Sequence, residues 1–276
     1  MSQAPSDPAD PIASLRFFSR LAFRVIAFCQ RPWVVAVLAL WQRFLLEPII
    51  FVFLISRRLR IHGAERLASI PPGAPLFVIA NHRTFFDLFI VGWTLLNRCG
   101  LRRRISFPVR ANFFYEHPLG LLINLLLAGG AMFPPFFRLR DRHGVNEHAL
   151  GLVVARLRQQ GTLVGFHPEG TRSKDQDPYQ LLPAQVGAGL IALKTRPDSV
   201  IVPAFINGLS NSFGREVWNN LLGREPVIIV FGAPPDLSQW PTETRISHHK
   251  KCSDVLLAGI GKLGEEEKAL RAALGA

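Results

Sequence analysis

The 276-residue sequence has few cysteines, few acidic residues and no lysine before Lys174. Its three cysteines form no CxxC or Cys/His pair, which excludes a disulfide scaffold and a zinc module and favours a reducing compartment. The opening segment MSQAPSDPADP lacks a basic stretch followed by a short apolar run, so no secretory signal is expected. Residues 1–11 are instead predicted to be a disordered tail.

Basic residues outnumber acidic residues. The sequence has 32 Lys and Arg and 20 Asp and Glu, which gives a net charge of +12. Most of these cations are arginines, whose planar guanidinium binds phosphate. The excess is compatible with anionic lipid, nucleic acid or a phosphorylated substrate, and equally with a GC-rich coding bias. No base-stacking or groove-reading motif accompanies the charge, so nucleic acid is not an expected partner.

Long hydrophobic runs are also scarce, although hydrophobic residues make up 49% of the chain and the mean hydropathy is +0.21. The transmembrane candidate, Trp33–Ile55, is divided by polar residues into apolar runs at 33–41 and 48–55, each too short to span a bilayer. On insertion scales its apolar residues contribute roughly −5 to −9 kcal/mol and its central Arg and Glu cost about 5 to 7 kcal/mol. This near balance favours an in-plane anchor in one leaflet, with a single kinked span as the alternative.

An amphipathic helix is predicted ahead of this segment, over Ile12–Gln30, because three arginines recur there at a four-residue spacing: Arg16, Arg20 and Arg24. Such a helix lies either in the interface of an anionic membrane or against the protein's own core. Residues 16–60 hold eight arginines and a single acid, which favours the membrane. Residues 12–59 are therefore predicted to form a two-helix anchor on the cytoplasmic face of the inner membrane.

The rest of the chain, residues 60–276, alternates short β-like runs with helical patterns. The expected strands are Leu76–Ala80, Ile105–Val109, Leu163–Phe166, Val200–Phe205 and Val227–Phe231. The expected helices are Phe86–Asn97, Pro118–Leu127, Val145–Gln159, Ala184–Lys194 and Ile246–Leu274, the last interrupted near Gly259–Gly264. This alternation predicts a single α/β domain with a central mixed, mostly parallel sheet flanked by helices.

Two residues that can form a catalytic dyad follow the first of these strands, in the window LFVIANHRTFFD. His82 and Asp87 are five positions apart, so in one continuous helix they would lie on different faces. They can meet only if His82 lies in a turn and Asp87 in the first helical turn. The carboxylate would then accept the Nδ1 proton and leave Nε2 free to take a proton from an alcohol. The spacing alone is weak evidence for a dyad, because histidine and aspartate also occur five positions apart by chance.

A second polar turn follows the strand at Leu163–Phe166. It reads His-Pro-Glu-Gly-Thr-Arg-Ser, in which Gly170 allows close approach of a ligand to the backbone and Thr171 offers a hydroxyl. Arg172 suits a phosphate, and Glu169 can accept a hydrogen bond from a hydroxyl. An ordinary Pro-Glu-Gly turn with a surface arginine is the alternative for this window taken alone.

Together, the Asn-His-x4-Asp motif at 81–87 and the Pro-Glu-Gly-Thr-Arg-Ser motif at 168–173 resemble the glycerolipid acyltransferase family, the 1-acylglycerol-3-phosphate acyltransferases. The resemblance covers residues 60–240 and extends to Pro108-Val-Arg110, to Gly129-Gly130 followed by Arg138, and to Ile201-Val-Pro-Ala204. The sequence departs from the family pattern in having His167 where phenylalanine is usual, Gln185 where lysine is common and arginine for lysine at position 110.

The resemblance implies an enzyme in which His82 is the general base and Asp87 its orienting partner. It assigns Glu169, Gly170, Thr171 and Arg172 to the glycerophosphate site, with further phosphate or oxyanion contacts from two arginines, Arg110 and Arg138; Arg140 competes with Arg138 for its role. The implied reaction transfers a fatty acyl group from acyl-CoA or acyl carrier protein to the sn-2 hydroxyl of a lysophospholipid, 1-acyl-sn-glycerol 3-phosphate.

No metal or other cofactor is expected in this reaction. The alternatives are the same chemistry on another acceptor, such as glycerol 3-phosphate or another lysolipid, and a non-enzymatic membrane-binding protein.

Overall fold

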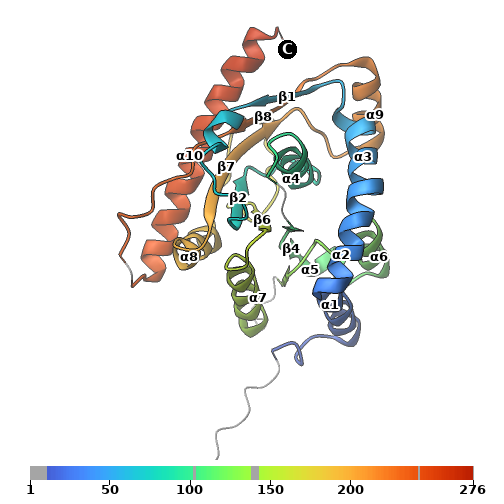
Figure 1. The fold of residues 1–276 in the computed structure, drawn as a ribbon, viewed down its shortest axis with the longest axis vertical. Helices are drawn as coiled ribbons and strands as arrows, with labels where there is room; N and C mark the ends of the chain where they lie inside the picture. Colours follow the sequence, from blue (N-terminus) through green and yellow to red (C-terminus); the bar gives the residue numbers. More distant parts are fainter. Residues whose placement is uncertain (1–10, 102–103, 138–142, 242, 276) are drawn as a thin grey trace, which may run out of the picture. The chain divides into compact units, whose positions relative to one another are not determined.

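The computed structural model describes residues 11–101, 104–137, 143–241 and 243–275, and it divides into two compact units. The sheet unit comprises Leu45–Ser106 and the chain from Val154 onward; the helical unit comprises the chain up to Phe44 together with Phe107–Val153. Figure 1 gives the element labels that are used below. The predicted membrane helices up to Phe44 thus share a unit with a later part of the chain.

A six-stranded sheet forms the centre of the sheet unit, in the order β1-β8-β7-β2-β6-β3. Its strands are β1 (Leu59–His62), β2 (Leu76–Ala80), β3 (Arg104–Ser106), β6 (Thr162–Phe166), β7 (Val200–Asn207) and β8 (Val227–Phe231). Neighbours pair in parallel except β7 and β8, which are antiparallel. Every residue of β2 and β8 is buried, as expected for strands covered on both faces. The predicted mixed, mostly parallel sheet is confirmed.

Helices flank this sheet, as predicted (Figure 1). On one side α8 (Val186–Thr195) packs with α10 (Ile246–Ala273), which also contacts β7 and β8; on the other side lies α4 (Asp87–Asn97), which contacts β2, β6 and β7. The sequence analysis predicts α4, α8 and α10 but neither β1 nor α9 (Phe213–Leu222).

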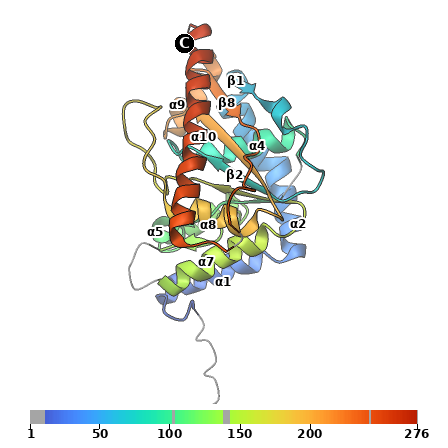
Figure 2. The ribbon, with the colours of Figure 1, turned by 90° about the vertical axis from the view of Figure 1, so that its left-hand side faces the viewer.

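The predicted interruption of the last helix near Gly259–Gly264 is wrong, because α10 runs without a break from Ile246 to Ala273 (Figure 2). A Cβ atom at Gly264 would lie 2.9 Å from a ring carbon of Phe205 in β7. Glycine therefore lets the helix lie closely against the sheet, and this packing outweighs the low helix propensity of the residue.

The predicted strand Ile105–Val109 is two separate strands. Its first part lies in β3, whereas β4 (Val109–Arg110) pairs in parallel with β5 (Pro135–Phe136) in a two-stranded sheet. Pro108 lies between them and has no N–H to donate to a ladder, so one continuous strand is interrupted at this position.

The helical unit has a core of its own, to which α1 (Phe17–Cys29) contributes. Ala22, Phe23 and Ile26 of this helix are buried in a cluster with Ala111 and Tyr115. The remaining helices of the unit are α2 (Pro32–Trp41), α5 (Ala111–Phe114), α6 (Pro118–Leu126) and most of α7 (His143–Arg156). One side of the predicted amphipathic helix therefore packs on the protein's own core, while other apolar residues of α1 are exposed: Phe17, Leu21 and Phe28.

The segment predicted as a membrane anchor continues as one helical stretch of 24 residues, Pro32–Ile55. It consists of α2, a π-helical turn at Gln42–Leu46, α3 (Glu47–Ile50) and a second π-helical turn, η2 (Phe51–Ile55). Its most apolar window has a mean hydropathy of 1.8, so this helix is long and apolar enough to cross a membrane by length and composition.

Candidate active site

The two polar turns of the sequence analysis meet at one edge of the sheet. Strands β2 and β6 are parallel neighbours, with Leu76 opposite Leu163 and Ile79 opposite Phe166. The residues that follow each strand therefore emerge side by side at the carboxyl edge, where open α/β sheets bind ligands. A hydrogen bond of 2.8 Å from the Ser173 N–H to the His82 carbonyl joins the two turns directly.

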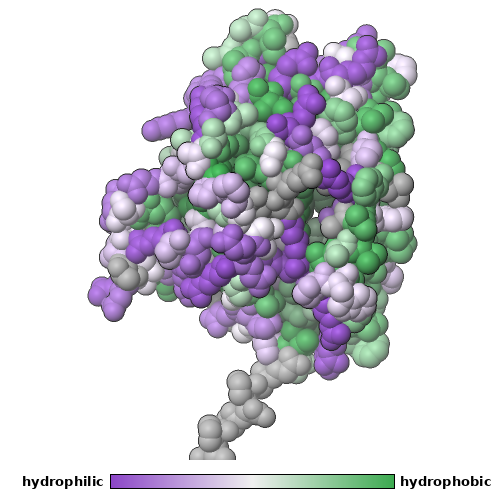
Figure 3. Space-filling view, viewed as in Figure 1, coloured by the Kyte–Doolittle hydropathy of each residue, from purple (hydrophilic) through white to green (hydrophobic). Residues whose placement is uncertain are grey.

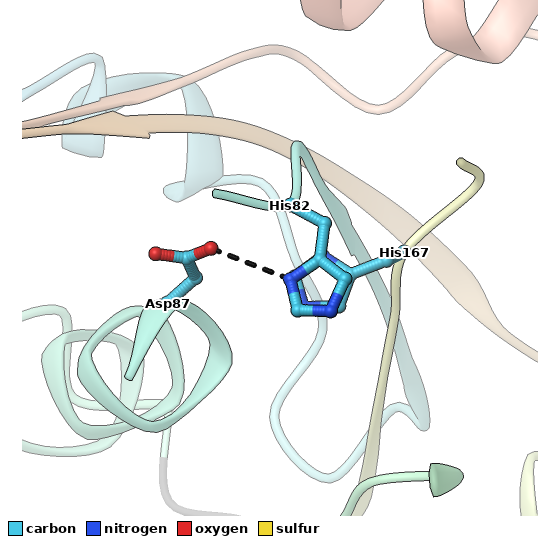
Figure 4. Close-up of side chains that lie close together, drawn as sticks. All are labelled: His82, Asp87 and His167. Carbon is cyan, nitrogen blue, oxygen red and sulfur yellow. Dashed lines mark hydrogen bonds and ion pairs between the residues drawn. The ribbon is translucent and has the colours of Figure 1, made fainter. Parts of the chain in front are cut away.

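The predicted dyad forms in the manner its spacing requires. His82 lies in the turn after β2, and Asp87 is the first residue of α4. Figure 4 shows the Asp87 carboxylate directed at the His82 ring, with 3.5 Å between Nδ1 and Oδ2. The Asp87 side chain is 1% exposed, whereas that of His82 is 21% exposed. An acceptor hydroxyl can therefore reach the imidazole while the carboxylate stays shielded from water.

Asp87 is fixed by its neighbours in the turn. Its Oδ2 accepts hydrogen bonds of 2.7 Å from the backbone N–H groups of Arg83 and Thr84, and its Oδ1 accepts from the Thr84 hydroxyl at 2.5 Å. These donors satisfy the buried charge, which would otherwise be costly to bury. The carboxylate thus holds the turn that carries His82 and also faces the His82 ring.

Glu169 connects the same turn to a more distant part of the chain. Its Oε1 accepts from the His82 N–H at 2.7 Å, and its Oε2 accepts from the Leu182 N–H at 2.8 Å. The side chain is 1% exposed, and burial raises the pKa of its carboxyl above the ordinary value, while these two hydrogen bonds lower it. Both carboxylate oxygens therefore contact backbone groups, an arrangement that positions the His82 backbone.

The two residues that follow Glu169 lie at the surface of the turn. Gly170 has a φ of 63°, in the left-handed region that favours glycine, and a Cβ there would meet the Gln185 side chain at 2.9 Å. Thr171 is half-buried beside it. The sequence-predicted group Glu169, Gly170 and Thr171 therefore lies at the same sheet edge as the dyad.

Arg172 is exposed, and its guanidinium is oriented by Asn211, whose Oδ1 accepts from Nη1 at 3.0 Å. The same Oδ1 accepts from the Phe85 N–H at 3.1 Å, and the Asn211 amide donates to the Arg83 carbonyl at 3.4 Å. Asn211 follows β7 and so joins a third segment to the two polar turns. An exposed guanidinium at this edge can bind a phosphate oxyanion.

His167 lies against the ring of His82. Its ring stacks on that of His82 with centroids 3.7 Å apart and planes at 6° (Figure 4). Its Nδ1 is 3.0 Å from the Ala80 carbonyl, which can only accept, so this nitrogen carries the proton and Nε2 does not. Desolvation by burial, with the nearby His82 as a smaller cause, lowers the pKa of His167 to about 3. His167 is therefore a neutral support for the His82 ring.

His82, Asp87 and His167 place their potential ligand atoms within 4.8 Å of one another, which raises the question of a metal site. A metal bound to an imidazole nitrogen lies near the plane of that ring. Two stacked, nearly parallel rings cannot both direct a lone pair at one ion. In addition, Asp87 already accepts from the Arg83 and Thr84 backbone. The arrangement fits a general base with its orienting carboxylate.

The neutral state of His167 predicts how stability depends on pH. Because its pKa is about 3 in the folded protein and ordinarily 6.5, the unfolded chain binds a proton between these values and the folded protein does not. Stability is complete above pH 6.5 and falls as the pH decreases, by up to about 1.4 kcal/mol per pH unit.

We expect His167→Phe, which retains an aromatic ring but cannot be protonated, to remove this loss. Between pH 7 and pH 5 the wild type should lose up to about 2 kcal/mol more than the variant in the free energy of unfolding, measured by urea titration at both pH values. Equal pH dependence of the two proteins would contradict the assigned neutral state.

Two predicted contacts remain, Arg110 and Arg138. Arg110 ends β4 and precedes α5 in the helical unit, and Arg138, like its competitor Arg140, lies outside the described residues. Their assignment to the phosphate or oxyanion stays a prediction. The cysteines do not compete with the dyad for the chemistry, since burial raises the pKa of Cys252 in α10 to about 11 and keeps it a thiol.

Two contributors to the site are not predicted by the sequence analysis. Asn211 stands in a stretch with no motif, and only the fold brings it to Arg172. Arg83, inside the first motif, donates to Ser173 Oγ and to the carbonyls of Asp175 and Asp177, so it holds the loop after the second motif. A basic residue beside the dyad could have marked Arg83 as part of the site. Its partners could not be predicted, because they lie ninety residues away in the chain.

The fold and this site define an α/β protein with a histidine–aspartate pair at the carboxyl edge of its sheet. Residues 58–207, more than half of the chain, match the family model described as Acyltransferase. The chain belongs to the acyltransferase family and is an acyltransferase enzyme, which excludes the non-enzymatic alternative. The match includes both motifs and the strands β1, β2, β6 and β7.

Among solved structures, the chain is similar to the 1-acyl-sn-glycerophosphate (LPA) acyltransferase PlsC from Thermotoga maritima. The two share 18% sequence identity with a TM-score of 0.47, over 91% of this chain and 92% of the other. A search of curated proteins finds no match to the sequence.

Proposed function

We propose that this acyltransferase transfers a fatty acyl group to the sn-2 hydroxyl of 1-acyl-sn-glycerol 3-phosphate and so forms phosphatidic acid. The donor is acyl-CoA or acyl carrier protein, and no metal or other cofactor takes part. The observation that supports this most directly is the placement of His82, with its carboxylate partner, at the same sheet edge as Arg172. A proton acceptor and a phosphate-binding cation together suit a phosphorylated alcohol.

The chemistry needs a base, and His82 supplies it. With its Nδ1 proton directed to Asp87, Nε2 takes the proton of the acceptor hydroxyl while the hydroxyl oxygen attacks the thioester carbonyl carbon. The tetrahedral intermediate collapses, the carbon–sulfur bond breaks, and the thiolate takes the proton from the imidazolium. The charge on Asp87 stabilises that imidazolium, so no covalent enzyme intermediate is required.

The lipid character of the acceptor is supported by the membrane features of the chain. The 24-residue apolar helix Pro32–Ile55 and the arginine-rich sequence around it suit an anionic leaflet. We place the protein on the cytoplasmic face of the inner membrane, attached by an in-plane anchor, with a single span as the alternative. A lysophospholipid in that leaflet is then available without leaving the membrane.

The acceptor is tested directly by a panel of substrates. Purified protein in vesicles would be given 1-acylglycerol 3-phosphate, glycerol 3-phosphate and neutral or zwitterionic lysolipids, each with acyl-CoA and with acyl carrier protein, and the products read by mass spectrometry. We expect phosphatidic acid as the main product. Preferential acylation of glycerol 3-phosphate or of a lysolipid without a phosphate monoester would overturn the proposed acceptor.

Arg172→Ala tests the phosphate contact. Because the guanidinium would bind the acceptor phosphate, we expect kcat/KM for lysophosphatidate to fall about ten- to a hundredfold, the effect of roughly 1.5–3 kcal/mol for a charge-assisted hydrogen bond. KM for the donor should change little. Arg158→Ala, at an exposed arginine of the sheet unit that pairs with Asp198, is the matched control. Equal losses for donor and acceptor would instead assign Arg172 a structural role.

A further inference from the structure

Helix α9 has its polar side buried and its apolar side exposed. Glu216, Asn219 and Asn220 are buried, whereas four large hydrophobic residues are exposed by 43–60%: Phe213, Trp218, Leu221 and Leu222. With about 100° per residue, Trp218, Leu221 and Leu222 lie on the face opposite the buried polar residues, whereas Phe213 is exposed at the first residue of the helix. A surface helix of a water-soluble protein has the reverse arrangement. The outward side of α9 is therefore suited to an apolar environment.

Polar contacts hold α9 in this orientation. Glu216 forms a fully buried ion pair with Arg58 and also accepts from the Ser210 N–H at 2.8 Å. Asn220 donates to the Val52 carbonyl at 2.7 Å and accepts from the Arg57 N–H at 3.0 Å. Burial of an unpaired charge or amide would be costly, so these contacts oppose rotation of the apolar side inward.

The helix that α9 packs against exposes apolar residues of its own. Ile49, Val52 and Phe53, on α3 and η2, are exposed by 40–53%. They belong to the C-terminal part of the apolar helix Pro32–Ile55. Figure 3 shows hydrophobic surface gathered along the right-hand edge of the view, where α3 and α9 lie in Figure 1. Elsewhere in the described part of the sheet unit, large exposed hydrophobic residues are scattered over α8, α10 and the C-terminal end.

The start of α9 lies at the active site. Asn211 precedes the helix by two residues, and its side chain contacts Arg172 and the turn after His82, as described above. Any apolar phase or surface that contacts α9 would therefore lie next to the proposed phosphate site.

We propose that the apolar side of α9, together with Ile49, Val52 and Phe53, contacts the lipid bilayer and places the active site at the membrane surface. This lipid-facing surface is continuous with a helix apolar enough to enter a membrane. It carries Trp218, a residue type that favours the bilayer interface. Exposed arginines at its border, Arg57 and Arg224, suit anionic headgroups.

The lipid-facing surface adds a second attachment to that of the N-terminal helices. Membrane binding strengthens with the apolar area that enters the interface, so this surface would add to the attachment. The inference also deepens the proposed function and rests on it in one respect: a lysophospholipid would reach Arg172 from the leaflet along α9. Contact of α9 with lipid itself does not depend on which acceptor the enzyme uses.

Quenching of tryptophan fluorescence by brominated lipids tests the contact. Full-length protein would be reconstituted in phosphatidylcholine and phosphatidylglycerol vesicles, with and without brominated acyl chains. We expect Trp218→Phe to remove a strongly quenched component, and Trp240→Phe, a matched change in the same unit before α10, to leave the quenched signal unchanged. If the Trp218 component is not quenched while both variants have the wild-type Tm, α9 does not contact lipid and the proposal is overturned.

Activity provides the second measurement. With Trp218→Glu/Leu221→Glu, we expect acylation of long-chain lysophosphatidate in vesicles to fall about tenfold or more, since two apolar contacts are lost. Acylation of a short-chain, water-soluble lysophosphatidate should keep the wild-type rate, as should both reactions with Ile246→Glu on α10. Equal losses on both acceptors would contradict entry along α9. Wild-type protein that is quenched at Trp218 but does not acylate lysophosphatidate would refute the proposed acceptor and leave the lipid-facing surface intact.

Discussion

Replacing His82 by alanine is expected to lower kcat by about 10²–10⁴-fold, the usual contribution of a general base. The ring is partly exposed, and the contacts that shape its turn come from the His82 backbone and from Asp87. The fold should therefore survive the change. The rate is measured with saturating donor and acceptor, alongside circular dichroism and Tm.

His62→Ala is the matched control for this variant. His62 is a half-buried histidine on β1, separated from β2 in the sheet by β8 and β7. Its replacement should leave the rate close to that of the wild type. A folded His82→Ala enzyme that kept more than about a tenth of wild-type turnover would show that His82 is not the base.

Replacing Asp87 by asparagine is expected to be severe for activity and mild for stability. The Asn oxygen can still accept from His82 and from the Arg83 and Thr84 N–H groups, while its amide donates to a reoriented Thr84 hydroxyl. The turn and the tautomer of His82 would therefore be retained. The lost element is the negative charge that stabilises the imidazolium, and we expect kcat to fall about ten- to a hundredfold.

A comparison of two further variants separates charge from structure at this position. Asp87→Ala removes every acceptor of the turn and should lower Tm as well as kcat, whereas Asp87→Asn should lower kcat alone. Asp254→Asn, at an exposed ion-paired aspartate on α10, should change neither. If Asp87→Asn retained full activity, the carboxylate would have only the structural role of holding the turn.

The sequence predicts the contact between His82 and Asp87 because that contact is local. His82 and Asp87 are close in the chain, and their spacing limits them to a turn and the start of a helix, as observed. The strand that leads into the turn, Leu76–Ala80, has the predicted bounds, because five consecutive apolar residues flanked by turn residues leave little choice of structure.

The partners of those residues depend on the sheet. Glu169 accepts a hydrogen bond from the His82 N–H only because β6 lies beside β2 in parallel register. Its other carboxylate oxygen accepts from the Leu182 N–H because the loop after the motif folds back toward Glu169. The stack of His167 on His82 has the same origin. No periodicity encodes such contacts, since they depend on strand order.

The two helices that the sequence analysis misses or interrupts, α9 and α10, differ from the prediction for a common reason. Helix α9 has polar residues inside and apolar residues outside, the opposite of the pattern that identifies a surface helix. Helix α10 continues through glycines because Phe205 of the sheet packs against one of them. In both helices, contacts with a distant segment override the structural preference of the local sequence.

The sequence by itself therefore determined the fold class, the contact between His82 and Asp87, the resemblance to glycerolipid acyltransferases and the apolar N-terminal helix, since each rests on neighbouring residues or on hydropathy. The tertiary structure alone decided which groups hold the dyad, that Asn211 orients Arg172, and that α9 turns its apolar side outward. These features arise where strands and helices distant in the chain come into contact, and the free energy of such contacts is large enough to override local propensity.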